Sequence, residues 1–231
     1  MNLLAIETAT ESCSVALWHR GEVLTRSELA PRRHAELVLP MAESLLAEAG
    51  LSRRKLDGIA VGRGPGAFTG VRLAVSIAQG MALGLDLPVV PVSSLAALAM
   101  DAPLNGASIL ATIDARMGEV YSAAFARDAD GDLVELGLEH VGPADQVNVP
   151  RATSWNVIGS GWATYRDALS ARLPQAPLWA DGACYPQAAA VVRLAAREFL
   201  AGHAVAPELA LPIYLRDKVA LTLAEQGRRR A

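Results

Sequence analysis

Two acidic residues end apolar segments of the chain and could carry chemistry. Glu7 closes a run that begins at Leu3, and Asp114 closes a run that begins at Ser108. Carboxylates at the ends of two strands can flank a cleft, where they could hold a magnesium ion or act as a general base. The next residue, Thr8, would lie at the same end of the first strand. We therefore consider Glu7, Thr8 and Asp114 as candidates for a cleft.

A glycine-rich turn between a predicted strand and a predicted helix is the strongest local feature. The segment 62–72 reads Gly-Arg-Gly-Pro-Gly-Ala-Phe-Thr-Gly-Val-Arg, with Gly64 and Gly66 at its centre. Backbone amides at such a position could hold an anion. The segment matches neither the P-loop pattern nor Gly-x-Gly-x-x-Gly, because the third glycine comes one residue late. Two interpretations stay open, an anion-binding loop and a tight turn that needs glycine for close packing.

Other catalytic patterns are weak. The chain has four histidines, and His34 is followed at the i+4 position by Val38, so no helical metal pair forms there. Gly159-Ser160-Gly161 lacks the Gly-x-Ser-x-Gly spacing of a hydrolase nucleophile. Gly159 and Gly161 instead resemble a reduced form of a glycine turn that lies near adenosine in some nucleotide-binding folds. We predict no catalytic residue and no metal site.

Hydrophobic periodicity predicts an α/β fold made of two similar halves. In the first half, we expect strands at 3–6, 13–18, 23–25 and 59–62, with helices at 34–49 and 68–85. The second half again begins with apolar strands and tight turns, at 108–113, 119–125 and 133–134, and ends with a strong helix at 186–201. Two such halves with a cleft between them are typical of the actin, sugar-kinase and Hsp70 architecture. We predict lobes at 1–104, completed by 211–231, and at 105–210.

The two helices of the first half are more apolar than one core requires. The stretch from Leu73 to Leu85 carries no charge, and the helix at 34–49 has two apolar stripes. One stripe serves the core, and the other needs a cover that another protein chain could supply, although both helices could also be interior. Pro40 should kink the first helix or restart it. The candidate interface residues are His34, Leu37, Val38, Met41, Leu45, Arg72, Val75, Ala78, Gln79 and Ala82.

Composition limits the possible functions. The 231 residues are 52% hydrophobic and 19% charged, with a net charge of −3, which argues against disorder and against nucleic-acid binding by the chain alone. The apolar runs are too short for a membrane helix, and no signal peptide is apparent, so we expect a cytoplasmic protein. Cys13 and Cys184 should be reduced thiols. The basic tail Arg228–Arg230 is a solvated end or a contact for RNA or an acidic partner.

Four segments together resemble the TsaB family, also called YeaZ-like. They are 4–17, 62–72, 113–121 and the closing Pro-Ile-Tyr-Leu-Arg at 212–216, and they occur in order over nearly the whole chain. The resemblance implies an ASKHA fold (ribonuclease H-like) with two mixed sheets. It also implies a role in the threonylcarbamoylation of the adenosine next to the anticodon of tRNA.

The resemblance further implies a non-catalytic subunit that pairs with TsaD through a helix bundle and allows TsaE to join. The same surface would form a homodimer when TsaD is missing, and tRNA would be contacted through the complex. The family's first strand often ends in Asp, and the nucleotide-hydrolysing members of the wider fold place a glycine two residues later. Glu7 and Ala9 depart from that pattern, so we expect no resident cofactor and at most weak binding of ATP or ADP. A stand-alone ATPase and a protease that acts on the partner are the alternatives.

Overall fold

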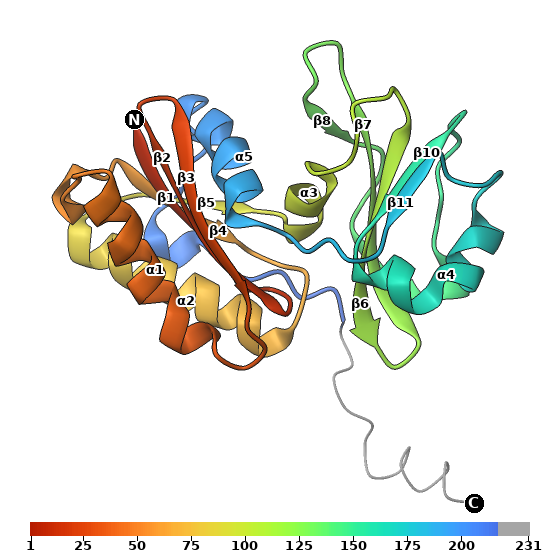
Figure 1. The fold of residues 1–231 in the computed structure, drawn as a ribbon, viewed down its shortest axis with the longest axis horizontal. Helices are drawn as coiled ribbons and strands as arrows, with labels where there is room; N and C mark the ends of the chain where they lie inside the picture. Colours follow the sequence, from red (N-terminus) through yellow and green to blue (C-terminus); the bar gives the residue numbers. More distant parts are fainter. Residues whose placement is uncertain (217–231) are drawn as a thin grey trace, which may run out of the picture.

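The computed structural model describes residues 1–216, which form two lobes that each centre on a mixed β-sheet (Figure 1). The sheet of the first lobe has the strand order β3-β2-β1-β4-β5. Its strands are β1 (Asn2–Glu7), β2 (Ser12–His19), β3 (Glu22–Leu29), β4 (Gly58–Gly62) and β5 (Val89–Val92). The predicted contacts of the tail Arg228–Arg230 lie outside the described residues.

Helices cover both faces of the first sheet. α1 (His34–Glu48) and α2 (Phe68–Leu85) pack on one face, and α5 (Ala188–Leu200) packs on the other (Figure 1). Successive side chains of a strand point to opposite faces, so Leu4 and Ile6 of β1 join the core under α1 and α2. Leu3 and Ala5 join the core under α5.

The second lobe repeats this strand plan. Its sheet has the order β11-β10-β6-β7-β8, with β9 also paired to β7. The strands are β6 (Ser108–Arg116), β7 (Glu119–Arg127), β8 (Leu133–Glu135), β9 (His140–Pro143), β10 (Trp155–Ile158) and β11 (Trp179–Asp181). In each lobe the first strand pairs antiparallel with the second and parallel with a later strand. The predicted structural repeat is therefore confirmed.

Two helices flank the second sheet. α3 (Ser94–Ala99) packs on the face that looks toward the first lobe and also contacts α5, whereas α4 (Ser160–Arg172) packs on the far face. α4 is kinked at Tyr165, whose φ of −126° and ψ of 36° are not helical. Single 3-10 turns occupy Arg53–Lys55 (η1), Ala144–Gln146 (η2) and Pro207–Leu209 (η3).

Polar contacts join the lobes beside α3. Ser93 caps α3 by accepting a hydrogen bond from the amide of Ala96. The Ser93 hydroxyl donates to Glu139 of the second lobe, and Arg63 of the first lobe donates to the same carboxylate at 3.2 Å. Glu139 is 8% exposed, so among residues 1–216 this contact is the most buried ion pair between the lobes.

The predicted lobe boundaries need one correction. The second lobe was expected at 105–210, but α5 packs on the first sheet, and the second sheet ends at Asp181. The chain therefore returns to the first lobe before α5, because the apolar face of α5 is complementary to β1 and β2. Residues 211–216 contact both lobes, since the Ile213 amide donates to the Arg63 carbonyl and Arg216 donates to the Ala115 carbonyl.

Helix α1 runs through Pro40 without interruption, so the predicted restart is wrong. Pro40 lies on the exposed side of the helix, where water can bind the carbonyl that has lost its amide partner. The short strands β9 and β11 were not predicted, because they carry no clear alternation. Cys13 is buried, Cys184 is half-buried, and both are free thiols.

Among the described residues, α2 alone is long and apolar enough to cross a membrane by length and composition, with a mean hydropathy of 1.3. A core helix passes the same test, and α2 buries one side against the first sheet. The high mean hydropathy of α2 is explained by this packing and by the apolar residues on its outward side, which are described below.

Candidate functional site

A cavity of about 720 Å³ opens between the two lobes. Its walls are the loop after β1, the first turns of α1 and α2, the end of β6 and residues 213–216. Of the seven residues predicted to line a cleft, Gly66 and Asp114 line this cavity. The cavity thus lies at the carboxyl ends of β1 and β6, the first strand of each lobe, as predicted. Most of the residues in its walls were not predicted.

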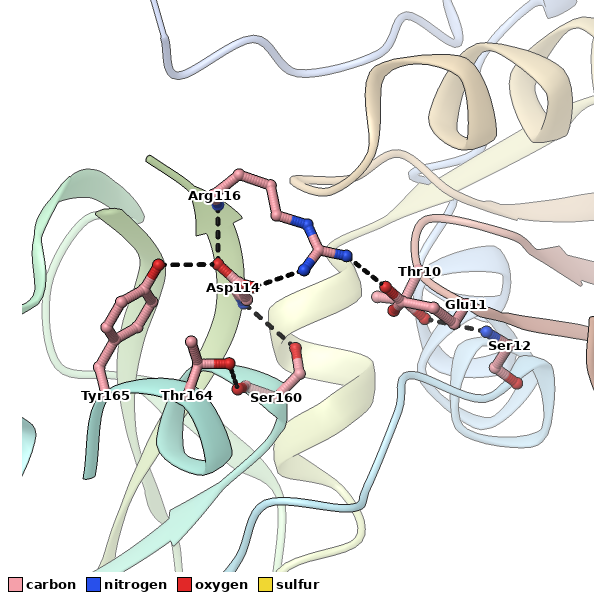
Figure 2. Close-up of polar contacts among 8 residues, drawn as sticks. All are labelled: Thr10, Glu11, Ser12, Asp114, Arg116, Ser160, Thr164 and Tyr165. Atoms are coloured by element: carbon pink, nitrogen blue, oxygen red, sulfur yellow. Dashed lines mark hydrogen bonds and ion pairs between the residues drawn. The ribbon is translucent and has the colours of Figure 1, made fainter. Parts of the chain in front are cut away.

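Asp114 is the centre of the polar contacts in the cavity (Figure 2). Its carboxylate accepts hydrogen bonds from the amide of Arg116 at 2.7 Å, the guanidinium of Arg116 at 2.8 Å and the hydroxyl of Tyr165 at 3.2 Å. The Asp114 amide donates to the Ser160 hydroxyl at 3.1 Å. Partial burial and the charge of Asp114 raise the pKa of Tyr165. The Asp114 carboxylate therefore already accepts three hydrogen bonds from within the chain.

Arg116 links the two lobes across the mouth of the cavity (Figure 2). Its guanidinium also donates to Glu11 at 2.7 Å, which lies in the loop after β1. Arg116, Met117 and Gly118 all have positive φ, so the β6–β7 turn is tight and projects this guanidinium toward the first lobe. The Arg116 side chain is 70% exposed, and an exposed ion pair of this kind contributes little to stability.

Glu7 does not reach the cavity, which corrects the prediction that Glu7 and Asp114 face each other. Glu7 is fully buried, and its carboxylate accepts hydrogen bonds from the Ala9 amide and the Ser94 hydroxyl, both at 2.7 Å. Burial raises the pKa of Glu7. The space for this carboxylate exists because Gly62 has no Cβ, since any side chain there would overlap it. The acid that reaches the cavity from this loop is Glu11.

The glycines of the 62–72 turn serve close packing. A Cβ on Gly66 would overlap the carbonyl of Ala9, and a Cβ on Gly70 would overlap the carbonyl of Thr8. The Ala67 amide donates to the Ala9 carbonyl at 2.7 Å, which holds the turn against the end of β1. Thr8 is buried and bonds the Gly70 carbonyl through its hydroxyl. Of the two open interpretations, this geometry favours the tight turn.

The second lobe uses glycine in the same way. Neither Gly159 nor Gly161 lines the cavity, because the backbone there lies against Thr112 at the end of β6. A Cβ on Gly159 would overlap the Thr112 carbonyl, and a Cβ on Gly161 would overlap the Thr112 side chain. Gly64 is likewise buried, with a positive φ of 88°. These positions support the strand ends rather than form a nucleotide pocket.

No group of three or more His, Cys, Asp or Glu side chains in residues 1–216 could hold a metal ion. His34 lines the cavity and is half-buried, and its Nε2 atom has no hydrogen-bond partner among the described residues. Val38, one turn further along α1, is fully buried in the core. The donor set of this part of the chain therefore does not fit a metal.

The predicted interface residues separate into two groups in the structure. Half of them are buried against the first sheet and cannot meet another protein: Val38, Leu45, Val75, Ala78 and Ala82. The prediction is wrong for these side chains, because helices of such uniform apolar composition do not reveal which stripe faces the sheet. The others reach the surface fully or in part: His34, Leu37, Met41, Arg72 and Gln79.

Two exposed apolar side chains on the outward sides of α1 and α2 were not among the predicted interface residues. Leu39 on α1 is 47% exposed, and Leu83 on α2 is 64% exposed. Leu37, Met41, Leu73, Ile77 and Met81 lie half-buried on the same two helices. Exposed apolar side chains on neighbouring elements can mark an interaction site. We call this surface the outer face of α1 and α2.

Arg72 occupies one end of this face in a stacked position. Its guanidinium lies 3.5 Å from the centre of the Phe68 ring and 5.2 Å from the centre of the Tyr214 ring. Its Nε atom donates to the Tyr214 hydroxyl at 2.6 Å. Stacking of this kind fixes an arginine in one orientation. Tyr214 belongs to the closing Pro-Ile-Tyr-Leu-Arg motif at 212–216. In the sequence, only the family resemblance of this motif indicated that these residues contribute to a site.

Known proteins resemble this chain over most of its length. A family model described as TsaD: tRNA N6-adenosine threonylcarbamoyltransferase matches residues 25–223. The chain is 41% identical over 232 residues to the tRNA threonylcarbamoyladenosine biosynthesis protein TsaB of Escherichia coli, covering 95% of this chain and 96% of that protein. It is 39% identical over 229 residues to the same-named protein of Haemophilus influenzae, covering 95% of each.

The fold has close structural relatives. A solved structure of YeaZ from Pseudomonas aeruginosa has a TM-score of 0.86 and 43% identity, over 93% of this chain and 99% of that one. Identity at this level along both chains, with matching topology, shows common descent and a shared ASKHA-type fold. This chain therefore belongs to the TsaB family of tRNA threonylcarbamoyladenosine biosynthesis proteins.

Proposed function

We propose that this chain is a non-catalytic scaffold that activates TsaD in the threonylcarbamoylation of the adenosine next to the tRNA anticodon. It pairs with TsaD through the outer face of α1 and α2, and the pair recruits the ATPase TsaE in the cytoplasm. The observation that carries the proposal is this outer face, where Leu39 and Leu83 remain exposed beside half-buried apolar side chains. The match of the TsaD family model to residues 25–223 supports a pairing of two related folds.

Two features of the interlobe cavity support an accessory role. The acid at the end of β1, Glu7, is buried and bonded to Ala9 and Ser94, so it is unavailable to a metal or to substrate. Asp114 reaches the cavity, but Arg116 and Tyr165 already bond its carboxylate. A catalytic base needs a free acceptor within reach of the reacting proton. The tRNA is then contacted through the complex.

Nucleotide binding in the cavity would be weak. The glycine turns at 62–72 and 159–161 are closed by the ends of β1 and β6, so their amides do not form an open phosphate cradle. The cavity does expose arginines to a bound anion, with Arg32, Arg116 and Arg216 in its walls. Arg116 and Arg216 are engaged with Glu11 and Glu119. An anion would have to displace these carboxylates, which lowers its affinity.

Reconstitution tests the proposal. Purified chain, TsaD, TsaE and tRNA are combined, and association and tRNA modification are measured with and without the chain. Leu39→Glu and Leu83→Glu place a charge on the outer face, and we expect both to abolish association and modification while the chain stays folded. Leu138→Glu is the matched control, because Leu138 is 92% exposed in the second lobe, and we expect it to behave like wild type.

The alternatives predict other outcomes. Brisk ATP turnover by the purified chain alone would favour a stand-alone ATPase. Cleavage of TsaD during incubation with the chain would favour a protease. Modification that proceeds equally well without the chain, or normal association of Leu39→Glu and Leu83→Glu, would contradict the proposed scaffold.

A further inference from the structure

The mouth of the interlobe cavity carries a stack of aromatic rings and arginine that the proposed function does not use. Phe68, the first residue of α2, and Tyr214 both line the cavity, and each is about half exposed. The centres of their rings lie 5.9 Å apart. The guanidinium of Arg72 is held against both rings. We call Phe68, Arg72 and Tyr214 the aromatic rim.

Contacts within the chain hold the aromatic rim in one arrangement. The Arg72 Nε atom donates to the Tyr214 hydroxyl at 2.6 Å, and the neighbouring Ile213 amide donates to the Arg63 carbonyl at 2.9 Å. These bonds fix the segment that carries Tyr214 beside the start of α2. Rings that stay half exposed while they are held in place offer apolar area to a planar ligand at little cost in side-chain entropy.

Arginines gather around the same cavity, although the whole chain has a net charge of −3. Arg32, Arg116 and Arg216 all line its walls. Arg116 and Arg216 pair with Glu11 and Glu119. In residues 1–216, Arg32 forms no ion pair within 4.0 Å, and it is exposed. The guanidinium of Arg32 is therefore available to an anion such as a phosphate group.

The backbone of two of these arginines adopts an unusual conformation. Arg32 has a φ of 70° and Arg116 a φ of 63°, in the left-handed region that residues with a side chain rarely adopt. Arg32 lies in the turn between β3 and α1, and Arg116 lies in the turn between β6 and β7. Strained backbone of this kind is concentrated at functional sites and ligand clamps. Each lobe thus presents an arginine to the cavity from a strained turn.

Aromatic rings beside arginines are the means by which proteins bind single-stranded nucleic acid, because the bases stack on the rings and the phosphates meet the cations. We propose that the aromatic rim and Arg32 bind a single-stranded nucleotide of the tRNA. The base stacks on the aromatic rim, and a neighbouring phosphate meets Arg32. The inference rests on the proposed function, since the tRNA reaches this chain in its complex with TsaD. It gives the chain a direct share of the RNA contact.

The chemistry of the cavity favours an RNA strand over a free nucleotide. The glycine turns at 62–72 and 159–161 are packed against strand ends, so they offer no cradle for a triphosphate. A strand carries one charge per nucleotide and needs only separate arginines such as Arg32. A duplex would keep its bases away from the rings. Ile213 and Leu215 add apolar wall to the same cavity, so the contact depends on stacking rather than on base sequence.

Binding of tRNA to the pair of this chain and TsaD tests the contact. Filter binding measures the dissociation constant for wild type, Tyr214→Ala, Tyr214→Phe and Arg32→Gln. We expect Tyr214→Ala to weaken binding about tenfold, because the stacking of one base is lost, and Tyr214→Phe to stay within about twofold. Arg32→Gln should weaken binding about threefold and reduce the slope of log K against log salt by about 0.7. Arg151→Gln, an exposed arginine in the second lobe, should change neither quantity.

Photo-cross-linking locates the RNA on the surface while the aromatic rim stays intact. Thr69 is exposed and lines the cavity next to Phe68. Thr69→Cys coupled to azidophenacyl bromide should cross-link to tRNA, whereas Leu138→Cys, at a site that is 92% exposed in the second lobe, should not. Coupling at pH 8 spares the native thiols, because burial raises the pKa of Cys13 to about 11 and of Cys184 to about 12.

Three results would overturn the proposal. They are wild-type tRNA binding by both Tyr214→Ala and Arg32→Gln, an equal loss in Tyr214→Ala and Tyr214→Phe, which excludes stacking, or equal cross-linking from positions 69 and 138. If Tyr214→Ala loses TsaD, Arg32→Gln and the cross-link decide.

Association with TsaD is measured in parallel for every variant, so that the two proposals fail separately. Variants that pair with TsaD and bind tRNA like wild type refute the RNA contact alone. A wild-type chain that never pairs with TsaD refutes the scaffold. Cross-linking of tRNA from position 69 of the unpaired chain at low salt then supports the RNA contact, and its absence refutes that contact too.

Discussion

Gly70 and Gly80 lie on the same helix, and changing each to alanine should alter the stability of the chain in opposite directions. An alanine Cβ at position 70 would lie 2.0 Å from the carbonyl oxygen of Thr8, whereas at position 80 it would meet nothing within 4 Å. The two substitutions are chemically identical. Any difference between them therefore comes from the surroundings of the helix.

The magnitudes follow from these surroundings. At position 80, alanine replaces a poor helix former and should raise the free energy of unfolding by about 0.8–1 kcal/mol. At position 70, the Cβ and the Thr8 carbonyl must separate by more than about 1 Å, and such overpacking costs about 1–3 kcal/mol. The same movement strains the buried 2.7 Å hydrogen bond from Thr8 to the Gly70 carbonyl, which adds about 1–3 kcal/mol if it is lost. These costs sum to about 2–6 kcal/mol, and the gain in helix propensity offsets about 1 kcal/mol of them, so we expect Gly70→Ala to lower the free energy of unfolding by about 1–5 kcal/mol.

Urea unfolding, followed by circular dichroism, measures both changes. The protein is kept dilute, so that the stability of Gly80→Ala is measured on single chains. The denaturation midpoint should rise for Gly80→Ala and fall for Gly70→Ala, with the slope m unchanged for both. A neutral Gly70→Ala variant, or a fall in both midpoints, would refute the assignment of these glycines to a packed and an open environment.

Three further changes test the buried polar groups. Burial raises the folded-state pKa of Glu7 above 4.5, so its ionisation destabilises the fold as pH rises through that pKa. Glu7→Gln should therefore be more stable than wild type at pH 8 by urea unfolding, and this advantage should vanish at pH 4; a pH-independent difference would contradict it. Glu139→Gln leaves Arg63 without its buried partner and should lower the free energy of unfolding by about 1–3 kcal/mol, whereas Glu36→Gln in an exposed pair should change it by less than about 1 kcal/mol. With pKa values of about 11 and 12, Cys13 and Cys184 should react with Ellman's reagent at pH 8 only after unfolding, and rapid labelling of the native chain would argue against their burial.

The secondary structure was largely predictable from the sequence. The predicted helix at 68–85 has the same bounds as α2, and the first helix differs from α1 by one residue at its end. Apolar runs with glycine-rich turns on either side define the strands because local patterns fix their length and type. The repeat of strand order in the two lobes was also visible, since each half begins with the same succession of strands and turns.

The composition of the cavity was not predictable in the same way. Glu7 is the last residue of β1 and Glu11 lies in the loop that follows it, and only the fold decides which carboxylate turns inward and which reaches the cavity. Glu7 turns inward because Gly62 leaves space beside it and Ser94, from a distant helix, supplies a hydrogen bond. A sequence pattern contains neither the neighbouring strand nor the helix that covers its end.

The family and its architecture were thus determined by the sequence alone, because ordered motifs and hydrophobic periodicity are properties of the chain itself. The tertiary structure decided which side of each helix is free. Val75 and Leu83 are both apolar residues of α2, yet one is 4% exposed and the other 64% exposed. Their chemistry is nearly the same, so only the position of the sheet beneath α2 separates a core residue from one that can meet another protein.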